Sequence, residues 1–422
     1  MLFKADRNAI SGESARRLGA MLLLGFSSGL PLALTASTMQ AWLTVEGLDI
    51  KRIGLFNQVQ IPYMLKFLWS PLVDRFKMLG LGRRRDWMLL SQLLLIVAIT
   101  TMGTLSPGQH LALVAWVALA VAFFSATQDI AVDAYRTDTL KERERGLGTG
   151  VFISGYRLAM LTSGALALIL AQHLGWRHTY WLMAALLLIG VVTTLFSPEP
   201  EENGAAPRNL RAALVDPFRD YFSREGAMAM LLLVFLYKLG DALAGSLSTT
   251  FFIRELGFTI QEVGLINKVL GLAATIIGAL AGGVWMMRLP LYPALMGFGI
   301  LQAVTNLGFW ALALSGKSYV GMAAVVALEN LAGGMGASAA TALLMALCNV
   351  RYSATQFALL SALAVVGRIL IGSRSGYAVE AVGWADFFLL TFVAALPGLL
   401  VLHLLRHRVP QPSITSSEGM TA

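Results

Sequence analysis

The sequence predicts an all-α polytopic membrane protein with twelve membrane-spanning helices in two related six-helix halves. Three observations predict this class. The 422 residues are 57% hydrophobic and 13% charged, with a mean hydropathy of +0.69, and a soluble protein this apolar could not cover its surface with polar groups. The apolar residues form runs long enough to cross a hydrocarbon core, which takes about 20 residues. Segments of the first half recur, in the same order, in the second half.

The apolar runs fall into two sets of six. The first set covers residues 18–37, 53–73, 87–105, 111–134, 146–171 and 180–196. The second set covers residues 227–253, 263–286, 291–314, 319–347, 356–380 and 387–405. Residues 198–226, between the sets, are polar and contain four prolines. We therefore expect an N-terminal half (1–197), a cytoplasmic linker (198–226), a C-terminal half (227–408) and a polar cytoplasmic tail (409–422).

Basic residues gather in alternate loops. With the N-terminus inside, the cytoplasmic segments hold 21 Lys and Arg residues and the outer loops hold five. Cytoplasmic loops are enriched in these residues, so we expect both termini to lie in the cytoplasm. The net charge of +8 then serves topology and contacts with anionic lipid, and no nucleic-acid partner is expected. The single cysteine excludes an intramolecular disulfide and a Cys-based metal cluster, and nothing in the sequence indicates redox chemistry. We expect no metal and no cofactor.

The two halves share sequence. TVEGLDIKRIGLFNQV from Thr44 aligns without gaps on RELGFTIQEVGLINKV from Arg254, and LGWRHTYWL from Leu174 resembles VGWADFFLL from Val382. Duplicated halves place a substrate site between them near the middle of the membrane, with access alternating as one half rocks on the other. The repeat therefore predicts a secondary transporter.

Charged residues interrupt the apolar runs. Each costs roughly 2.5 to 3.5 kcal/mol at the bilayer centre, so such residues face a protein interior or a watery path. Asp129 and Asp133 are four residues apart, hence on one helix face. Two carboxylates that close in a low dielectric do not both ionise readily, so we predict proton coupling at Asp129, with Asp133 beside it. The alternative is that one of them only pairs with Arg136 or Arg157.

The segment SPLVDRFKMLGLGRRRDW, from Ser70, resembles the cytoplasmic loop signature of the major facilitator superfamily, an acid followed by a basic cluster. We predict that Asp74 forms a breakable latch, paired with a neighbouring arginine or a helix N-terminus when the cytoplasmic side is shut. The predicted gating residues are Asp74, Arg75, Arg83 and Arg84. For the arginines the alternative is that they only fix topology.

Longer segments resemble the AmpG-type muropeptide permeases. They are GFSSGLPLALTASTMQAWLTVEG from Gly25, LKFLWSPLVDR from Leu65, SATQDIAVDAYRTD from Ser125, LYKLGDALAGSLSTTFFIR from Leu236, ENLAGGMG from Glu329 and SATQFALLSALAVVGR from Ser353. The resemblance implies import of anhydromuropeptides across the bacterial inner membrane by proton symport, with roles in peptidoglycan recycling and β-lactamase induction. Relatives from enteric bacteria carry further C-terminal hydrophobic helices, whereas this chain ends in a polar tail.

Polar groups within the spans suit a sugar-peptide substrate. Cations can bind peptide carboxylates, amides can bind hydroxyl and acetamido groups, and aromatic rings can stack on sugars. The predicted contacts are Gln40, Trp42, Tyr63, Lys66, Gln128, Lys238, Asp241, Asn267, Lys268, Glu329 and Asn330. For each of them an interhelical contact is the alternative. Arg157 and Arg368 are predicted to form structural ion pairs.

Two other functions stay open at this stage. A different facilitator, such as a drug exporter or a nutrient symporter, would share the topology and the latch. A membrane-embedded transferase would need a base or nucleophile at a water-facing site, but every histidine falls at a helix end or in a loop, and Cys348 lies in an apolar run. We therefore expect a transporter and not an enzyme, acting as a monomer.

Overall fold

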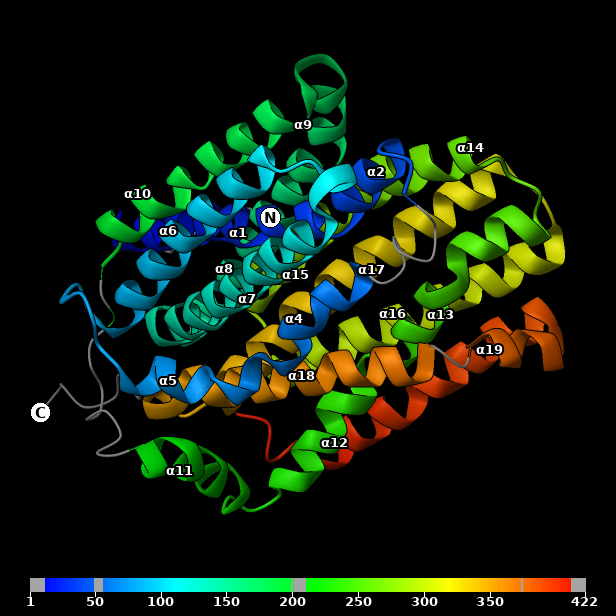
Figure 1. Ribbon diagram of the computed structural model, residues 1–422. Coiled ribbons are helices and arrows are strands. Elements are labelled where there is room, and N and C mark those ends of the chain that lie inside the picture. Colours follow the sequence, from blue (N-terminus) through cyan, green and yellow to red (C-terminus); the bar gives the residue numbers. More distant parts are fainter. Residues whose placement is uncertain (1–11, 49–55, 199, 201–209, 373–374, 411–422) are drawn as a thin grey trace, which may run out of the picture. The chain divides into compact units, whose positions relative to one another are not determined.

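The computed structural model describes residues 12–48, 56–198, 200, 210–372 and 375–410, and every regular element in these residues is helical (Figure 1). Contacts divide the chain into two compact units. Unit 1 comprises the described residues within 1–140, 148–227 and 348–369. Unit 2 comprises those within 141–147, 228–347 and 370–422. A segment from the second half of the sequence, 348–369, thus belongs to unit 1.

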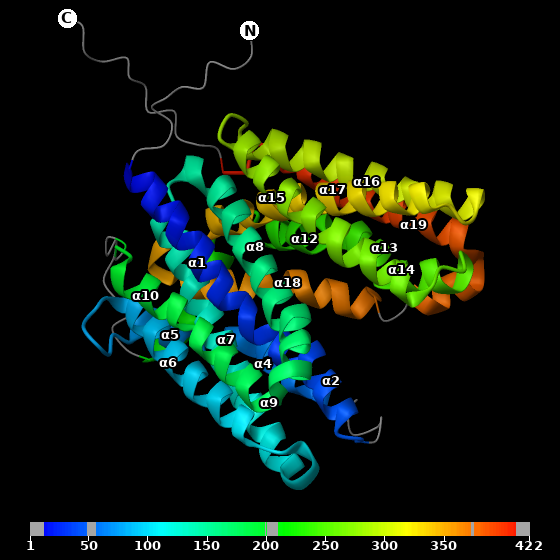
Figure 2. The same ribbon diagram turned by 90° about the horizontal axis from the view of Figure 1, so that it is seen from above.

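Unit 1 is built from helices of the first half of the chain and from most of α18. Its elements are α1 Gly12–Thr35, α2 Ser37–Val45, η1 Phe56–Gln60, α4 Ile61–Leu65, η2 Lys66–Leu68, α5 Ser70–Arg75, α6 Arg83–Thr104, α7 Pro107–Thr139, α8 Arg145–Leu161, η4 Thr162–Leu166, α9 Ala167–Leu186, α10 Leu188–Phe196, α11 Leu210–Phe222, η7 Val350–Tyr352 and α18 Ser353–Gly372. Helix α6 packs on α7 and α9, and α1 packs on α7 and α10 (Figure 2).

Unit 2 is built mainly from helices of the second half of the chain. Its elements are η3 Glu142–Glu144, α12 Ala227–Tyr237, α13 Leu239–Thr250, η5 Phe251–Glu255, α14 Ile260–Leu265, η6 Ile266–Gly271, α15 Leu272–Met286, α16 Leu291–Ser315, α17 Tyr319–Leu347 and α19 Ser375–Leu404. Helix α17 packs on α15 and α16, and α19 packs on α13 and α16. A core of buried aromatic rings joins η5 to α16 and α19. Its rings are Phe251, Phe252, Phe309, Phe387 and Phe388.

The predicted spans agree with the helices. Nine helical stretches of the described part are long and apolar enough to cross a membrane. One of them, Glu142–Phe196, has 55 residues and contains two predicted spans, which lie on either side of the kink at Gly175. The predicted spans 53–73 and 356–380 include residues outside the described part. Each remaining predicted span coincides with one stretch.

The repeat seen in the sequence is also present in the backbone. Gly47 and Gly257, which align in the first repeated segment, have φ values of 76° and 66°. Gly175 and Gly383, which align in the second, have φ values of 77° and 80°. Only glycine adopts this left-handed region readily. Both halves therefore turn at the same aligned glycines, as expected of duplicated halves.

Candidate functional site

A cluster of charges lies on α7 in unit 1. The Asp133 carboxylate accepts from Lys66 Nζ at 3.3 Å and from Arg136 Nη2 at 2.9 Å. Asp129, one turn away, lies beside Ser28 and within electrostatic range of Lys66 and Asp133. It makes no ion pair within 4 Å of another described residue. Asp133 is thus neutralised by two cations, whereas Asp129 can gain or lose a proton without breaking an ion pair.

A break in the helix preceding α5 brings Lys66 to this cluster. The α-helical turn α4 ends at Leu65, and the short 3₁₀ helix η2 begins at Lys66. Prolines at the first turns of α4 and α5, Pro62 and Pro71, are compatible with such restarts because a first-turn residue needs no N–H donor. Both α4 and η2 contact α7. The irregular segment therefore presents its lysine to the carboxylates of α7.

A second cluster of charges lies in unit 2. Lys238, between α12 and α13, has non-helical backbone angles, and its Nζ donates to Asp241 Oδ2 at 3.1 Å and to the Gly333 carbonyl at 3.5 Å. Glu329 of α17 lies within electrostatic range of Lys238 and Asp241. Asn330 Nδ2 donates to Glu329 Oε2 at 2.9 Å. Interrupted helices with charges at the break are typical of transporter binding sites.

Asp74, at the end of α5, is fully buried and accepts four hydrogen bonds. Arg84 Nη2 donates at 2.9 Å, the amides of Ala354 and Thr355 at 3.2 and 2.8 Å, and Thr355 Oγ1 at 2.6 Å. The amides belong to the first turn of α18, where a carboxylate is favoured by unpaired N–H groups and the helix dipole. The structure thus joins Asp74 both to an arginine and to a helix N-terminus.

Arg84 extends the Asp74 contacts to α7. It donates through Nε to Asp138 at 2.8 Å and through Nη2 to Ser353 Oγ at 2.8 Å. Arg83 donates to the Asp74 carbonyl at 2.9 Å, and Arg75 lies over the ring of Phe76. Three helices of unit 1 are thereby tied to the start of α18. We call Asp74, Arg84, Asp138, Ser353 and Thr355 the α18 latch.

Two predicted substrate contacts face packed protein. Gln128 is fully buried and donates to Ser27 Oγ at 3.1 Å, across the α1–α7 contact. Trp42 is 2% exposed, with its ring centroid 5.6 Å from that of Trp176 and 5.1 Å from that of Tyr180. Neither side chain presents a surface to a ligand in this structure. Their physical role here is helix packing.

The remaining predicted residues are Gln40, Tyr63, Arg157, Asn267, Lys268 and Arg368. Gln40 and Tyr63 are half-buried. Arg157 contacts the Met160 sulfur at 3.9 Å in its own helix. The side chains of Asn267, Lys268 and Arg368 lie outside the described part.

Asp138, Ser353 and Thr355 are residues that the sequence interpretation missed. A local signal could have located Ser353 and Thr355, because the segment Ser353-Ala-Thr-Gln356 before an apolar run has the residue spacing typical of a helix start. Nothing local marks Asp138, whose partner Arg84 is 54 residues away.

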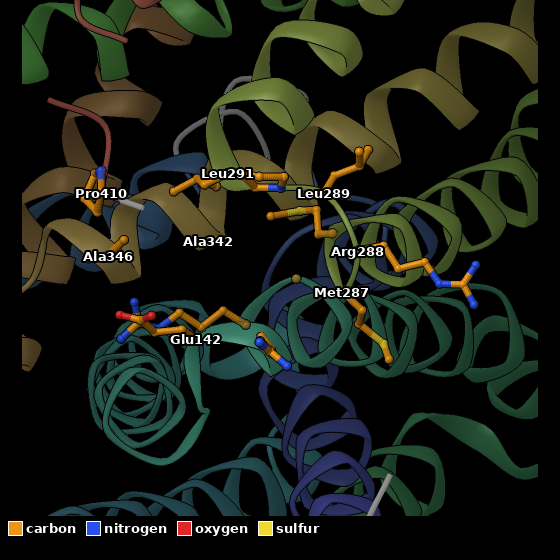
Figure 3. Close-up of a pocket in the computed structure, with 13 residues that line it drawn as sticks. Glu142, Met287, Arg288, Leu289, Leu291, Ala342, Ala346 and Pro410 are labelled. Atoms are coloured by element: carbon orange, nitrogen blue, oxygen red, sulfur yellow. The ribbon is translucent and has the colours of Figure 1, made fainter. Parts of the chain in front are cut away.

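A pocket of about 410 Å³ lies elsewhere in unit 2 (Figure 3). Glu142, Met287, Arg288, Leu291 and Pro410 are among the residues that line it. None of the residues of the Lys238 cluster does so. This pocket is therefore separate from that cluster.

Comparisons with known proteins place the chain in a family. The Major Facilitator Superfamily model matches residues 21–315. The anhydromuropeptide permease of Escherichia coli K12 is 54% identical over 387 residues, 92% of this chain and 79% of the relative. An uncharacterized protein of Haemophilus influenzae is 38% identical, over 94% of this chain and 96% of its own. The structure of the proton:xylose symporter XylE superposes with a TM-score of 0.70, covering 94% of this chain and 96% of that chain. Because its sequence is only 10% identical, this likeness concerns the fold alone. The chain therefore belongs to the Major Facilitator Superfamily and, within it, to the family of the anhydromuropeptide permeases.

Proposed function

We propose that this chain imports anhydromuropeptides across the bacterial inner membrane together with protons. The observation that carries the proposal is the 54% identity to a permease of that name across 92% of this chain. Both termini are cytoplasmic in this proposal, and the transporter acts as a monomer. Import then serves peptidoglycan recycling and the induction of β-lactamase.

The two charge clusters support the proposal. A sugar-peptide carries carboxylates, and Lys238 can exchange its partner Asp241 for a substrate carboxylate, so that the lysine stays paired with one negative charge. Asp129 can accept a proton, since no cation of the described residues lies within 4 Å of its carboxylate. Proton uptake there removes a negative charge from beside Lys66 and Asp133. Substrate and proton thus act on separate clusters, each inside one unit.

Gating is assigned to the α18 latch. Asp74 and Arg84 hold the first turn of α18 by charge-assisted hydrogen bonds, which are strong but break as a group when the helix moves. Release of Ser353 and Thr355 would free α18 to change position between states of the transport cycle.

Uptake of a radiolabelled anhydromuropeptide by cells that lack their own permease tests the substrate. Expression of this chain should restore uptake, and an empty vector should not. Lys238→Met should reduce uptake strongly at equal membrane abundance. Lys317→Met, which removes an exposed lysine, is the matched control and should transport normally. Restored uptake of another sugar or of a drug, without uptake of anhydromuropeptide, would contradict the proposal.

A further inference from the structure

Helix α11 is shorter and more polar than the spans, since its 13 residues include charged residues at positions 211, 216, 219 and 220. One of its sides is packed, with Ala213, Pro217 and Tyr221 buried. On the same side Asp220 accepts from Gln356 Nε2 at 2.8 Å and from Asn349 Nδ2 at 3.1 Å. All of these residues are in unit 1. The helix is therefore held in a fixed orientation on that unit.

The neighbouring side of α11 exposes large apolar side chains. Leu214, Val215 and Phe222 are 43%, 50% and 49% exposed, and Phe218 is half-buried among them. On a helix of 3.6 residues per turn these positions fall within one arc of about 100°. Arg211, one turn before Leu214, falls in the same arc, and its side chain lies outside the described part. Arg219 borders the arc; it is exposed and its side chain makes no ion pair or hydrogen bond with the residues that the structure describes. The apolar stripe from Leu214 to Phe222, with arginine at its N-terminal end, is typical of an interaction surface.

The chain after α11 indicates what covers the stripe. Residues 223–226 alone separate Phe222 from Ala227, where α12 and a membrane span begin. Five residue steps reach at most about 18 Å, so the end of α11 stays near the membrane surface. Exposed apolar surface continues at Met228, which is 68% exposed at the start of the span. The stripe is thus continuous along the chain with surface that faces lipid.

We propose that α11 lies in the lipid–water interface, with Leu214, Val215, Phe218 and Phe222 inserted at the boundary of head groups and acyl chains. Interfacial helices bury one apolar face in this way and keep the opposite face in water. Helix α11 then contacts lipid on one side and Asn349 and Gln356 on the other. It therefore couples the bilayer surface to the segment that leads into the α18 latch.

Spin-label accessibility in the full-length protein tests the proposal. In a Cys348→Ser background, single cysteines at Val215, Phe222 or Ser223 are labelled, and the protein is reconstituted in vesicles of phosphatidylethanolamine and phosphatidylglycerol. Ser223 is exposed and adjoins Phe222, but it falls on the polar side of the helix, so it is the matched control. All three positions are exposed, so the labels should not disturb folding.

The proposal predicts that labels at Val215 and Phe222 collide several-fold more often with oxygen, which dissolves in lipid, than with a water-soluble nickel chelate. The label at Ser223 should show the reverse preference. Equal preference for the nickel chelate at all three positions would overturn the proposal, because the stripe would face water. Protection of Val215 and Phe222 from both reagents would also overturn it, because a second protein or a second copy would cover the stripe.

Discussion

Asp129 and Asp133 are the same residue type on the same face of α7, but their surroundings differ. Asp133 is held by two cations, and Asp129 by none within 4 Å in the described part of the chain. The four-residue spacing predicts the shared face. It cannot predict which carboxylate is paired, because Lys66 comes from 67 residues away. The distinction matters, since a paired carboxylate holds helices and an unpaired one can carry a proton.

The pairing of Asp133 predicts a difference in stability. Asp133→Asn leaves Lys66 and Arg136 without their shared carboxylate, and removing one partner of a buried ion pair costs about 3 kcal/mol. Asp129→Asn breaks no such pair and should cost much less. Thermal unfolding of the purified variants in one detergent measures the difference, with the exposed Glu255→Gln as control. Equal losses of stability in the two aspartate variants would refute the assignment.

Two buried amide side chains in α16 lead to a second prediction about stability. Gln302 and Asn306 have no hydrogen-bond partner for either amide atom among the described residues. An unpaired buried polar group costs about 1 to 3 kcal/mol, so Asn306→Leu should raise the melting temperature. Asn330→Leu is the control and should lower it, because Asn330 accepts from Thr275 at 3.0 Å and donates to Glu329. A lower melting temperature for Asn306→Leu would show that the amide has a partner.

At the scale of elements, the α18 latch joins segments that are distant in the sequence. The basic cluster at 83–85 and the acid before it predict that Asp74 finds a cationic partner. They do not predict Ser353 and Thr355, which lie about 280 residues further along the chain. The latch combines a carboxylate, a guanidinium and the first turn of a helix, and each alone would hold α18 less firmly.

Removing the latch charge should expose the segment before α18. Asp74→Asn loses the charge-assisted bonds to Arg84 and Thr355, so Cys348, five residues before Ser353, should react faster with a maleimide. Asp86→Asn is the matched control, because Asp86 is also buried but accepts from the amides of Met78 and Leu79 in the loop before its helix α6. Unchanged labelling of Cys348 in Asp74→Asn would contradict the latch.

The contact between α11 and segment 348–356 should keep its full stability down to pH 5 and weaken only in stronger acid. Burial raises the pKa of Asp220, but hydrogen bonds from Gln356 and Arg224 outweigh burial and bring the pKa below its ordinary value. A carboxyl group whose pKa is lowered by folding contributes its full stabilisation above the ordinary pKa of about 3.9. This contribution is lost as the pH falls through the lowered pKa. Asp220→Asn should therefore lower the melting temperature equally at pH 7 and pH 5. A difference that shrinks between those two pH values would contradict this assignment.

At the scale of the whole molecule, the sequence predicts what depends on local pattern. Run length predicts the spans, and the repeated segments predict duplicated halves, which in the structure both turn at aligned glycines such as Gly47 and Gly257. The three-residue spacing of Lys238 and Asp241 likewise permits the pair that the structure contains. Gln128 and Trp42 show the limit of such reasoning, because burial depends on which neighbouring helix each face meets. Contacts such as Lys66 with Asp133 need the three-dimensional arrangement.

Proton-coupled import of anhydromuropeptide is tested most directly by uptake into liposomes that contain the purified protein, under an imposed pH gradient. Wild-type protein should accumulate labelled anhydromuropeptide when the lumen is alkaline and should stop when the gradient is collapsed. Asp129→Asn should still exchange substrate across the membrane but should not accumulate it. Gradient-driven accumulation by Asp129→Asn at the wild-type level, or wild-type uptake that ignores the gradient, would contradict the account.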